Sequence, residues 1–212
     1  MALKKSTNTA ALRPVEAREY TRDTDGLIAQ LADVDASVRR WAARDLAAHP
    51  AAAAVLCARL MIETEASVRA VIFSSAARMG SGLGGGVVVE SLLPLLRSEE
   101  PAMRNGAIEV LAGLPDAVAP HIEKLLMDAD GDVRIFSVNL LGDLKHSNVP
   151  QWLAQVLVND PSVNVVGAAL EVLAEVGTPA SLPALRTAAQ RFADDAYIGF
   201  AVDLAIGRIC AS

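Results

Sequence analysis

The stretch Asp128-Ala-Asp-Gly-Asp-Val-Arg-Ile-Phe-Ser-Val-Asn-Leu-Leu, residues 128–141, decides the fold because related stretches recur along the chain. An acidic turn comes first, then an apolar residue and usually Arg, and then apolar residues at helical spacing. The apolar residues that open the six copies are Val38, Val68, Met103, Val133, Val165 and Ile198. They stand 30, 35, 30, 32 and 33 residues apart, although the last two copies are weaker. Self-similarity at this period is typical of repeat proteins, so each copy predicts one structural unit.

Each unit is predicted to hold two helices, one before the acidic turn and one after it. The acidic side chains can cap the free N–H groups of the second helix and favour the positive end of its dipole. We expect the first helices at about 24–32, 50–62, 87–97, 116–127, 148–158 and 179–193. The predicted units are about 24–49, 50–80, 87–115, 116–147, 148–177 and 179–210, within one domain over 24–212. Residues 1–23 are expected to be an N-terminal arm, partly disordered or forming a capping helix.

Four arginines occupy the same place in consecutive units, directly after the apolar residue that opens the second helix. They are Arg39, Arg69, Arg104 and Arg134. Acidic pairs precede them: Asp33/Asp35, Glu63/Glu65, Glu99/Glu100 and Asp128/Asp130. Because the planar guanidinium can bridge the carboxylates or carbonyls of two adjacent turns, we expect a structural ladder along one side of the stacked units. A catalytic role for a residue repeated in every turn is disfavoured.

The repeated pattern resembles HEAT repeats, of the short HEAT-like type found in phycobilisome lyase subunits and related bacterial proteins. The residues that carry the resemblance are the acidic turn and Val-Arg, with Ala42-Ala43, Asp45-Leu46 and Leu140-Leu141-Gly142 at the matching places. The resemblance implies an all-α, right-handed α-solenoid of about six two-helix repeats. Val166 and Gly199 replace the ladder Arg in the last two units, so the final unit is expected to be a degenerate cap.

The resemblance also implies that the second helices line a concave face on which a partner protein would bind. Outward positions of these helices carry the predicted partner-binding residues Arg40, Trp41, Arg44, Val71, Arg78, Glu109, Ile135, Phe136, Asn139 and Asp143. Glu171 and Glu175 of unit five and Phe200, Leu204 and Arg208 of unit six fall at equivalent positions. The face therefore changes from basic to acidic along the array. Exposed aromatic residues are favoured interface anchors, but Trp41 and Phe136 could instead fold into contacts between repeats.

Other motifs carry weaker signals. The run Gly80-Ser-Gly-Leu-Gly-Gly-Gly contains a G-x-G-x-x-G, but a helix is expected before it, where a dinucleotide site needs a strand. A flexible linker is the favoured interpretation, and anion binding at the next helix remains an alternative. His49, His121 and His146 show no ligand spacing, so neither a metal nor another cofactor is expected. Cys57 and Cys210 are expected to be small buried hydrophobic residues, and a disulfide between them is disfavoured.

Composition and charge narrow the function. Hydrophobic residues make up 52% of the 212 residues and aromatic residues only 4%, which favours alanine-rich packed helices over an all-β fold. The net charge of −6 disfavours a nucleic-acid partner. No apolar run reaches the roughly 20 residues of a membrane span, so we expect a cytoplasmic protein without membrane contact. A non-enzymatic protein-binding scaffold is the leading hypothesis. A bilin lyase subunit or chromophore-handling chaperone, and a HEAT-like DNA glycosylase, are the alternatives.

Overall fold

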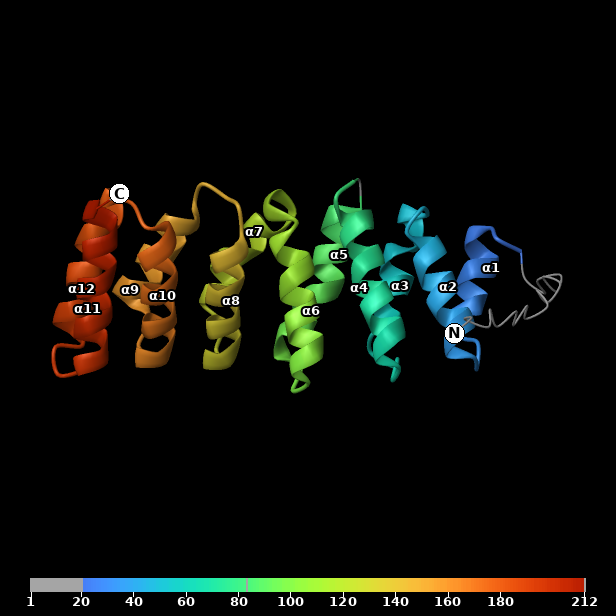
Figure 1. Ribbon diagram of the computed structural model, residues 1–212, viewed down its shortest axis with the longest axis horizontal. Helices are drawn as coiled ribbons and strands as arrows, with labels where there is room; N and C mark the ends of the chain where they lie inside the picture. Colours follow the sequence, from blue (N-terminus) through green and yellow to red (C-terminus); the bar gives the residue numbers. More distant parts are fainter. Residues whose placement is uncertain (1–20, 83, 212) are drawn as a thin grey trace, which may run out of the picture.

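The computed structural model describes residues 21–82 and 84–211, and its secondary structure in these ranges is entirely helical (Figure 1). Six helical pairs follow one another along the chain. In chain order, with short 3-10 helices marked η, the elements are α1 (Thr24–Gln30) and α2 (Ala36–Leu46); η1 (Pro50–Ala52), α3 (Ala53–Arg59) and α4 (Ala66–Gly80); α5 (Gly85–Leu92), η2 (Leu93–Arg97) and α6 (Pro101–Ala112); α7 (Pro115–Leu126) and α8 (Gly131–Asp143); α9 (Val149–Asn159) and α10 (Val163–Val176); and η3 (Pro179–Ser181), α11 (Leu182–Arg191) and α12 (Ala196–Ala211). The prediction of an all-α solenoid of two-helix repeats is confirmed.

The acidic turns start the second helix of several pairs. An Asp35 carboxylate oxygen accepts the backbone N–H of Ser37 at 2.8 Å, and Asp130 accepts that of Asp132 at 2.9 Å. Each bond satisfies an N–H group that has no partner inside its helix. Pro101 is the first residue of α6, where a missing N–H has no cost. The turn residues therefore fix where the second helices begin.

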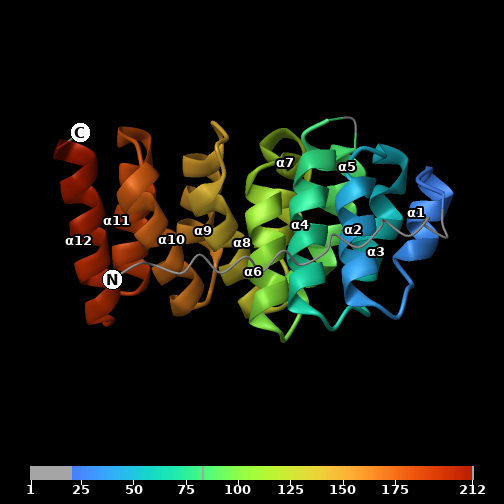
Figure 2. The same cartoon turned by 45° about the vertical axis from the view of Figure 1, so that its right-hand side comes forward.

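The helices form two layers. The second helices α2, α4, α6, α8, α10 and α12 contact one another in sequence, and the first helices α3, α5, α7, α9 and α11 do the same. Figures 1 and 2 show the second helices side by side in one row along the long axis. We call the outer side of this row the second-helix face. Its consecutive helices come from consecutive units, so residues at equivalent positions lie in a line along the array.

One continuous core joins the units, from Leu27 in α1 to Ile209 in α12. Fully buried alanines such as Ala42, Ala76 and Ala107 lie in second helices, where small side chains let neighbouring helices approach closely. Burial of apolar surface between every pair of neighbouring units is the main force that holds such an array together.

The glycine-rich segment after α4 also serves packing. A Cβ on Gly80 would lie 2.6 Å from a methyl group of Leu114, which directly precedes α7. A Cβ on Gly85 would lie 3.3 Å from the Cβ of Ala117. Helix α5 begins at Gly85, somewhat before the expected start at residue 87, and Gly84 is its N-cap. Gly85, the residue in close contact with Ala117, therefore lies inside the helix.

The predicted N-terminal arm falls mostly outside the described residues. Of residues 1–23, only Thr21, Arg22 and Asp23 are described. Asp23 caps α1 by accepting the N–H of Gly26 at 2.8 Å, and Arg22 forms an ion pair with Asp45 of α2. These residues therefore belong to the first repeat.

Candidate protein-binding surface

Arg39, in the first turn of α2, links the acidic turn of its own unit to the turn of the next. Its Nε and Nη2 donate to the two carboxylate oxygens of Glu63, both at 2.8 Å, and its Nη1 donates to the backbone oxygens of Asp33 and Val34. The Glu63 side chain is fully buried, and Arg59 also donates to it at 3.1 Å. These hydrogen bonds, above all those from Arg39, lower the pKa of the Glu63 carboxyl to about 2. This pair therefore joins units one and two at their turns.

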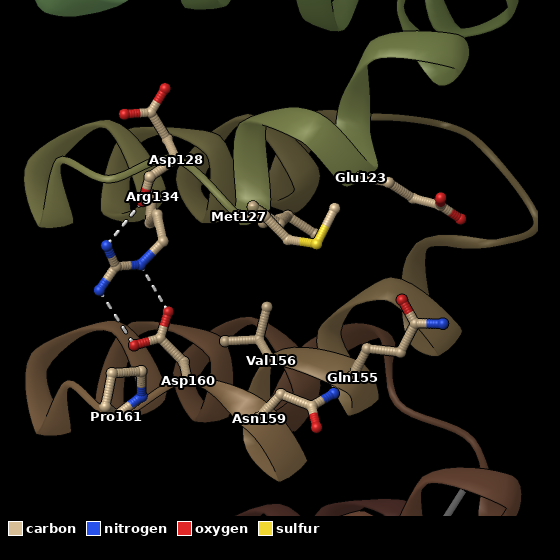
Figure 3. A pocket seen from close by; sticks show the side chains of 10 residues that line it. Glu123, Met127, Asp128, Arg134, Gln155, Val156, Asn159, Asp160 and Pro161 are labelled. Atoms are coloured by element: carbon tan, nitrogen blue, oxygen red, sulfur yellow. Dashed lines mark hydrogen bonds and ion pairs between the residues drawn. The ribbon is translucent and has the colours of Figure 1, made fainter.

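Arg134 repeats this arrangement between units four and five (Figure 3). Its Nε and Nη2 donate to the Asp160 carboxylate at 2.7 and 3.2 Å, and its Nη1 donates to the backbone oxygen of Asp128 at 2.8 Å. The carboxylate stabilises the charged guanidinium, so the pKa of Arg134 is raised further above its ordinary value. A hollow of about 430 Å³ lies beside the pair, between Met127 and Val156.

Arg69 makes the corresponding link between units two and three. Its Nε donates to the backbone oxygen of Glu63, in its own turn, at 2.6 Å. Its Nη1 forms an ion pair with Glu100, which is half exposed, in the turn of the next unit. The same arginine position thus spans two turns here as well, with a more hydrated carboxylate.

Arg104 departs from the prediction. Its Nη1 donates to the backbone oxygen of Ser98 at 2.5 Å, but it forms no ion pair with the described carboxylates of the next turn. Its guanidinium lies over the Phe136 ring of α8, 4.6 Å from the ring centroid, and its buried Nε has no hydrogen-bond partner in the structure. Asp128, the carboxylate that it was expected to reach, pairs with Arg97 instead. A cation–π contact therefore replaces the expected bridge between units three and four.

Three arginines that the sequence pattern did not single out also bind the turns. Arg59 and Arg97 are the last residues of their elements and pair with carboxylates of turns, as described above. Arg191, at the end of α11, donates to the backbone oxygens of Leu157 and Asp160 at 2.6 and 2.7 Å. A basic residue at the end of a first helix was the available signal, but it is present in only some units.

A second group of arginines gathers at the N-terminal end of the second-helix face, around Trp41. The guanidinium carbons of Arg40 and Arg44 lie 5.9 and 5.3 Å from the centroid of the Trp41 ring. Arg78, on α4, donates from Nη2 to the backbone oxygen of Arg44 at 3.1 Å. The Trp41 side chain nevertheless remains 47% exposed. We call these four residues the basic–aromatic patch.

The other predicted partner-binding residues lie on α4, α6 and α8 and are more scattered: Val71, Glu109, Ile135, Phe136, Asn139 and Asp143. The three polar ones are exposed, whereas the three apolar ones are partly buried, Val71 and Ile135 against the hydrophobic core. Phe136 is covered by Arg104, so it is less available as an anchor than Trp41. The structure therefore gathers the basic–aromatic patch closely and leaves the middle of the face mainly polar and acidic.

A groove of about 630 Å³ runs between α4 and α6 on this face. Its floor includes Phe73, a residue that sequence reasoning did not single out, and its rim includes Glu109 and Asn105. A Cβ on Gly106 would lie 2.5 Å from the Phe73 ring, so only glycine permits this close contact. The sequence signal was a glycine in the middle of a helix, which costs stability unless packing requires it.

The C-terminal end of the face exposes large apolar side chains. Phe200 and Leu204 of α12 are 67% and 44% exposed, at positions equivalent to Arg40 and Arg44. Tyr197 was not predicted. Its hydroxyl donates to Glu171 at 2.6 Å, and this hydrogen bond to the carboxylate raises the pKa of the phenol. The two ends of the face therefore have different chemistry.

The remaining predictions concern the glycine-rich run, the cysteines, metal ligands and membrane spans. Helix α4 precedes the glycine-rich run, so its context is not the strand–turn–helix of a dinucleotide site. The thiols of Cys57 and Cys210 are free, and burial raises the pKa of Cys57 to about 11. Cys210 is exposed near the end of α12, so the expectation that it is buried was wrong. Within residues 21–82 and 84–211, no three His, Cys, Asp or Glu side chains gather as metal ligands. In the same part of the chain, none of the helices is both long and apolar enough to cross a membrane.

Comparisons with known proteins found similar solved structures. An engineered protein is 19% identical, with 89% of this chain and 97% of that chain covered and a TM-score of 0.44. A designed armadillo repeat protein is 16% identical, with 88% and 100% covered and a TM-score of 0.43. The complex of CpcE and CpcF of phycocyanin lyase from Nostoc sp. PCC7120 is 17% identical, with 93% and 98% covered and a TM-score of 0.38. No curated protein sequence matches the chain.

The family comparison is the informative one. Residues 118–202, which run from α7 into α12, match the family model for HEAT repeats. The helical pairs before residue 118 repeat the same construction, with an acidic turn and an arginine at the start of the second helix. Residues 118–202 therefore consist of HEAT repeats, and the helical pairs before them are HEAT-like in construction.

Proposed function

We propose that this protein is a non-catalytic scaffold or adaptor that binds another protein along its second-helix face. The observation that carries the proposal is the exposed Trp41 ring, with the guanidinium groups of Arg40 and Arg44 within cation–π distance of it. Such a residue brings a large, rigid apolar surface to a polar rim, which is the composition of protein-interface hot spots.

The extent of the face supports a macromolecular partner. Exposed side chains that differ in charge and polarity follow one another from the basic–aromatic patch, through Glu109 and Asp143, to Phe200. An extended surface built from repeated units is suited to a long segment or a folded partner. The same sequence of charges disfavours a DNA duplex, because a phosphate backbone that leaves the arginines would next meet Glu109, Asp143 and Glu171.

Site-specific photo-crosslinking in the source cell tests the proposal. A crosslinking amino acid at Ser74 or Asn105, both exposed on second helices, should capture a discrete partner. The matched control is the same amino acid at Glu90, exposed on the first helix α5. Introducing Trp41→Ala should remove most of the crosslinks from Ser74, since losing a hot-spot aromatic weakens binding by about 2 kcal/mol.

The helical content of the Trp41→Ala variant should be unchanged, because the ring is half exposed. Crosslinks of equal yield from Glu90 and Ser74 would contradict the proposal, since the second-helix face would then have no special role. Undiminished crosslinks from Ser74 in the Trp41→Ala variant would remove Trp41 as the anchor.

A further inference from the structure

We infer that the partner of the basic–aromatic patch is an acidic peptide segment, whose carboxylates enter the hollow between the C-terminal ends of α2 and α4. The inference rests on the proposed function, since it names the chemistry of what that face binds. The hollow has a volume of about 370 Å³ and is lined by Arg44, Asp45, Ala47, Ala48 and Arg78.

The first argument is unsatisfied positive charge. Within the described ranges, no carboxylate forms an ion pair with Arg40, Arg44 or Arg78. The one carboxylate that lines the hollow, Asp45, already pairs with Arg22. Arg78 uses one N–H to bind the Arg44 carbonyl at 3.1 Å, and this contact positions its guanidinium while leaving most of its donors free.

The helix ends oppose this charge but are too weak to cancel it. Arg44 and Arg78 lie in the last turns of α2 and α4. The helix dipole places roughly half a negative charge at the C-terminal end of each of these two helices. A purely structural role for both arginines would be to offset these dipoles. Three full positive charges against roughly one negative charge in total still leave a net excess that attracts anions.

Geometry favours carboxylates on a peptide. A guanidinium accepts a carboxylate through two parallel N–H···O bonds, and a hollow with two such groups has room for one or two acidic side chains. Trp41 lies beside the arginines and offers an apolar surface for a neighbouring aliphatic residue. The site therefore suits acidic residues that alternate with apolar ones.

The rest of the face sets the direction of the segment. Beyond α4, the exposed carboxylates Glu109, Asp143, Glu171 and Glu175 would repel an acidic chain. The acidic part of the partner is thus confined to the α2–α4 end, and any continuation toward α12 meets first a negative surface and then the apolar Phe200.

The test uses the full chain and a synthetic probe, acetyl-Asp-Glu-Leu-Asp-Glu-Leu-amide, which contains no aromatic residue. Binding is followed by the fluorescence of Trp41, because the other tryptophan, Trp152, is buried and stacked on His146. The affinity of the matched probe with Lys in place of every Asp and Glu should be weaker by about tenfold or more. Binding of the acidic probe should also weaken as salt rises from about 50 to about 500 mM.

The decisive variant is Arg44→Glu with Arg78→Glu, which should lower the affinity for the acidic probe by about tenfold or more. The matched control is Arg186→Glu, an exposed arginine on α11, which should leave it unchanged. Circular dichroism and the thermal midpoint check that the double variant is folded. Should it fail to fold, the milder Arg44→Gln variant, with an expected loss of about threefold, takes its place.

Three results would overturn the inference: no saturable binding of the acidic probe, equal binding of the two probes, or an affinity unchanged by both the double and the Arg44→Gln variants. Tighter binding of a short DNA duplex than of the acidic probe would also overturn it in favour of nucleic acid. If the acidic probe fails while crosslinks still form from Ser74, the inference falls and the proposed function stands. If the probe binds but crosslinks arise equally from Glu90, the proposed function falls, and only the preference of the basic–aromatic patch for acidic peptides remains.

Discussion

Two sets of arginines at neighbouring positions of the same helices have opposite surroundings. Arg39 is buried and shares its donors among a carboxylate and two carbonyls, whereas Arg40, the next residue, is exposed and has no carboxylate partner among the described residues. Arg134 and Arg44 differ in the same way, since Arg134 pairs with Asp160 and Arg44 has no carboxylate partner among the described residues. Arginines at the turns hold the stack together, and arginines on the second-helix face are available to a partner.

The largest expected effect is the difference in stability between variants of Arg39 and Arg40. Arg39→Ala should lower the free energy of unfolding by about 3 kcal/mol or more, because it removes the bidentate partner of the buried Glu63 carboxylate and leaves it with Arg59 among the described cations. Arg40→Ala should change it by less than about 0.5 kcal/mol, since its side chain is exposed. Chemical denaturation of the two variants gives both values, and equal losses would show that burial does not separate the two sets.

The next effect is a dependence on pH. The Glu63 carboxyl has a pKa of about 2 in the folded protein against an ordinary 4.5, so unfolding between these values takes up a proton. The stabilisation is therefore complete above about pH 4.5 and is lost as the pH falls toward 2, by about 3 kcal/mol in all.

Denaturation curves recorded at several pH values between 2 and 6 measure this slope. Glu63→Gln should remove Glu63's share of it, whereas the control Glu90→Gln, at an exposed position on α5, should leave the slope as in the unmodified protein. Identical slopes in Glu63→Gln and the unmodified protein would mean that the buried pair does not control acid stability.

The smallest expected effect is the loss of stability on replacing Arg104, compared with that on replacing Arg134. Arg104→Met should cost about 1 kcal/mol or less, because Met keeps the apolar stem over Phe136 and removes an Nε that has no partner. Arg134→Met should cost about 3 kcal/mol, because it leaves the buried Asp160 carboxylate without its partner. Thermal midpoints compare the two variants directly. An equal decrease in both midpoints would contradict this account, because Arg104 would then bridge two turns as Arg134 does.

The repeat architecture was readable from the sequence because its causes are local. Acidic caps, the apolar residue at each helix start and the helical spacing that follows act within a few residues, and they predicted six helical pairs. The arginine contacts depend on the neighbouring unit as well. Arg69 and Arg104 occupy equivalent positions, yet only Arg69 has a carboxylate within reach, since Arg97 occupies Asp128 and Phe136 lies under Arg104.

The exposure of side chains at the edge of a helix face could not be predicted from the sequence either. Trp41 and Phe136 occupy the same position of α2 and α8, and helical spacing places both at the border between the core and solvent. Trp41 stays half exposed although two arginines lie beside it, whereas Phe136 is covered by the guanidinium of Arg104 from the preceding unit. The difference arises from the residue in the adjacent repeat, which a pattern confined to one unit does not contain.

The most direct measurement records two quantities on one matched pair of variants, Arg44→Gln and Arg134→Gln: the thermal midpoint and the affinity for the acidic peptide probe. Arg134→Gln should lower the midpoint by several degrees, at about 2–4 °C per kcal/mol for a chain of this size, and leave the affinity unchanged. Arg44→Gln should leave the midpoint unchanged and weaken the affinity by about threefold or more. A midpoint lowered equally by both variants, or an affinity that Arg44→Gln does not alter, would contradict the division of the arginines into those that hold the fold and those that bind a partner.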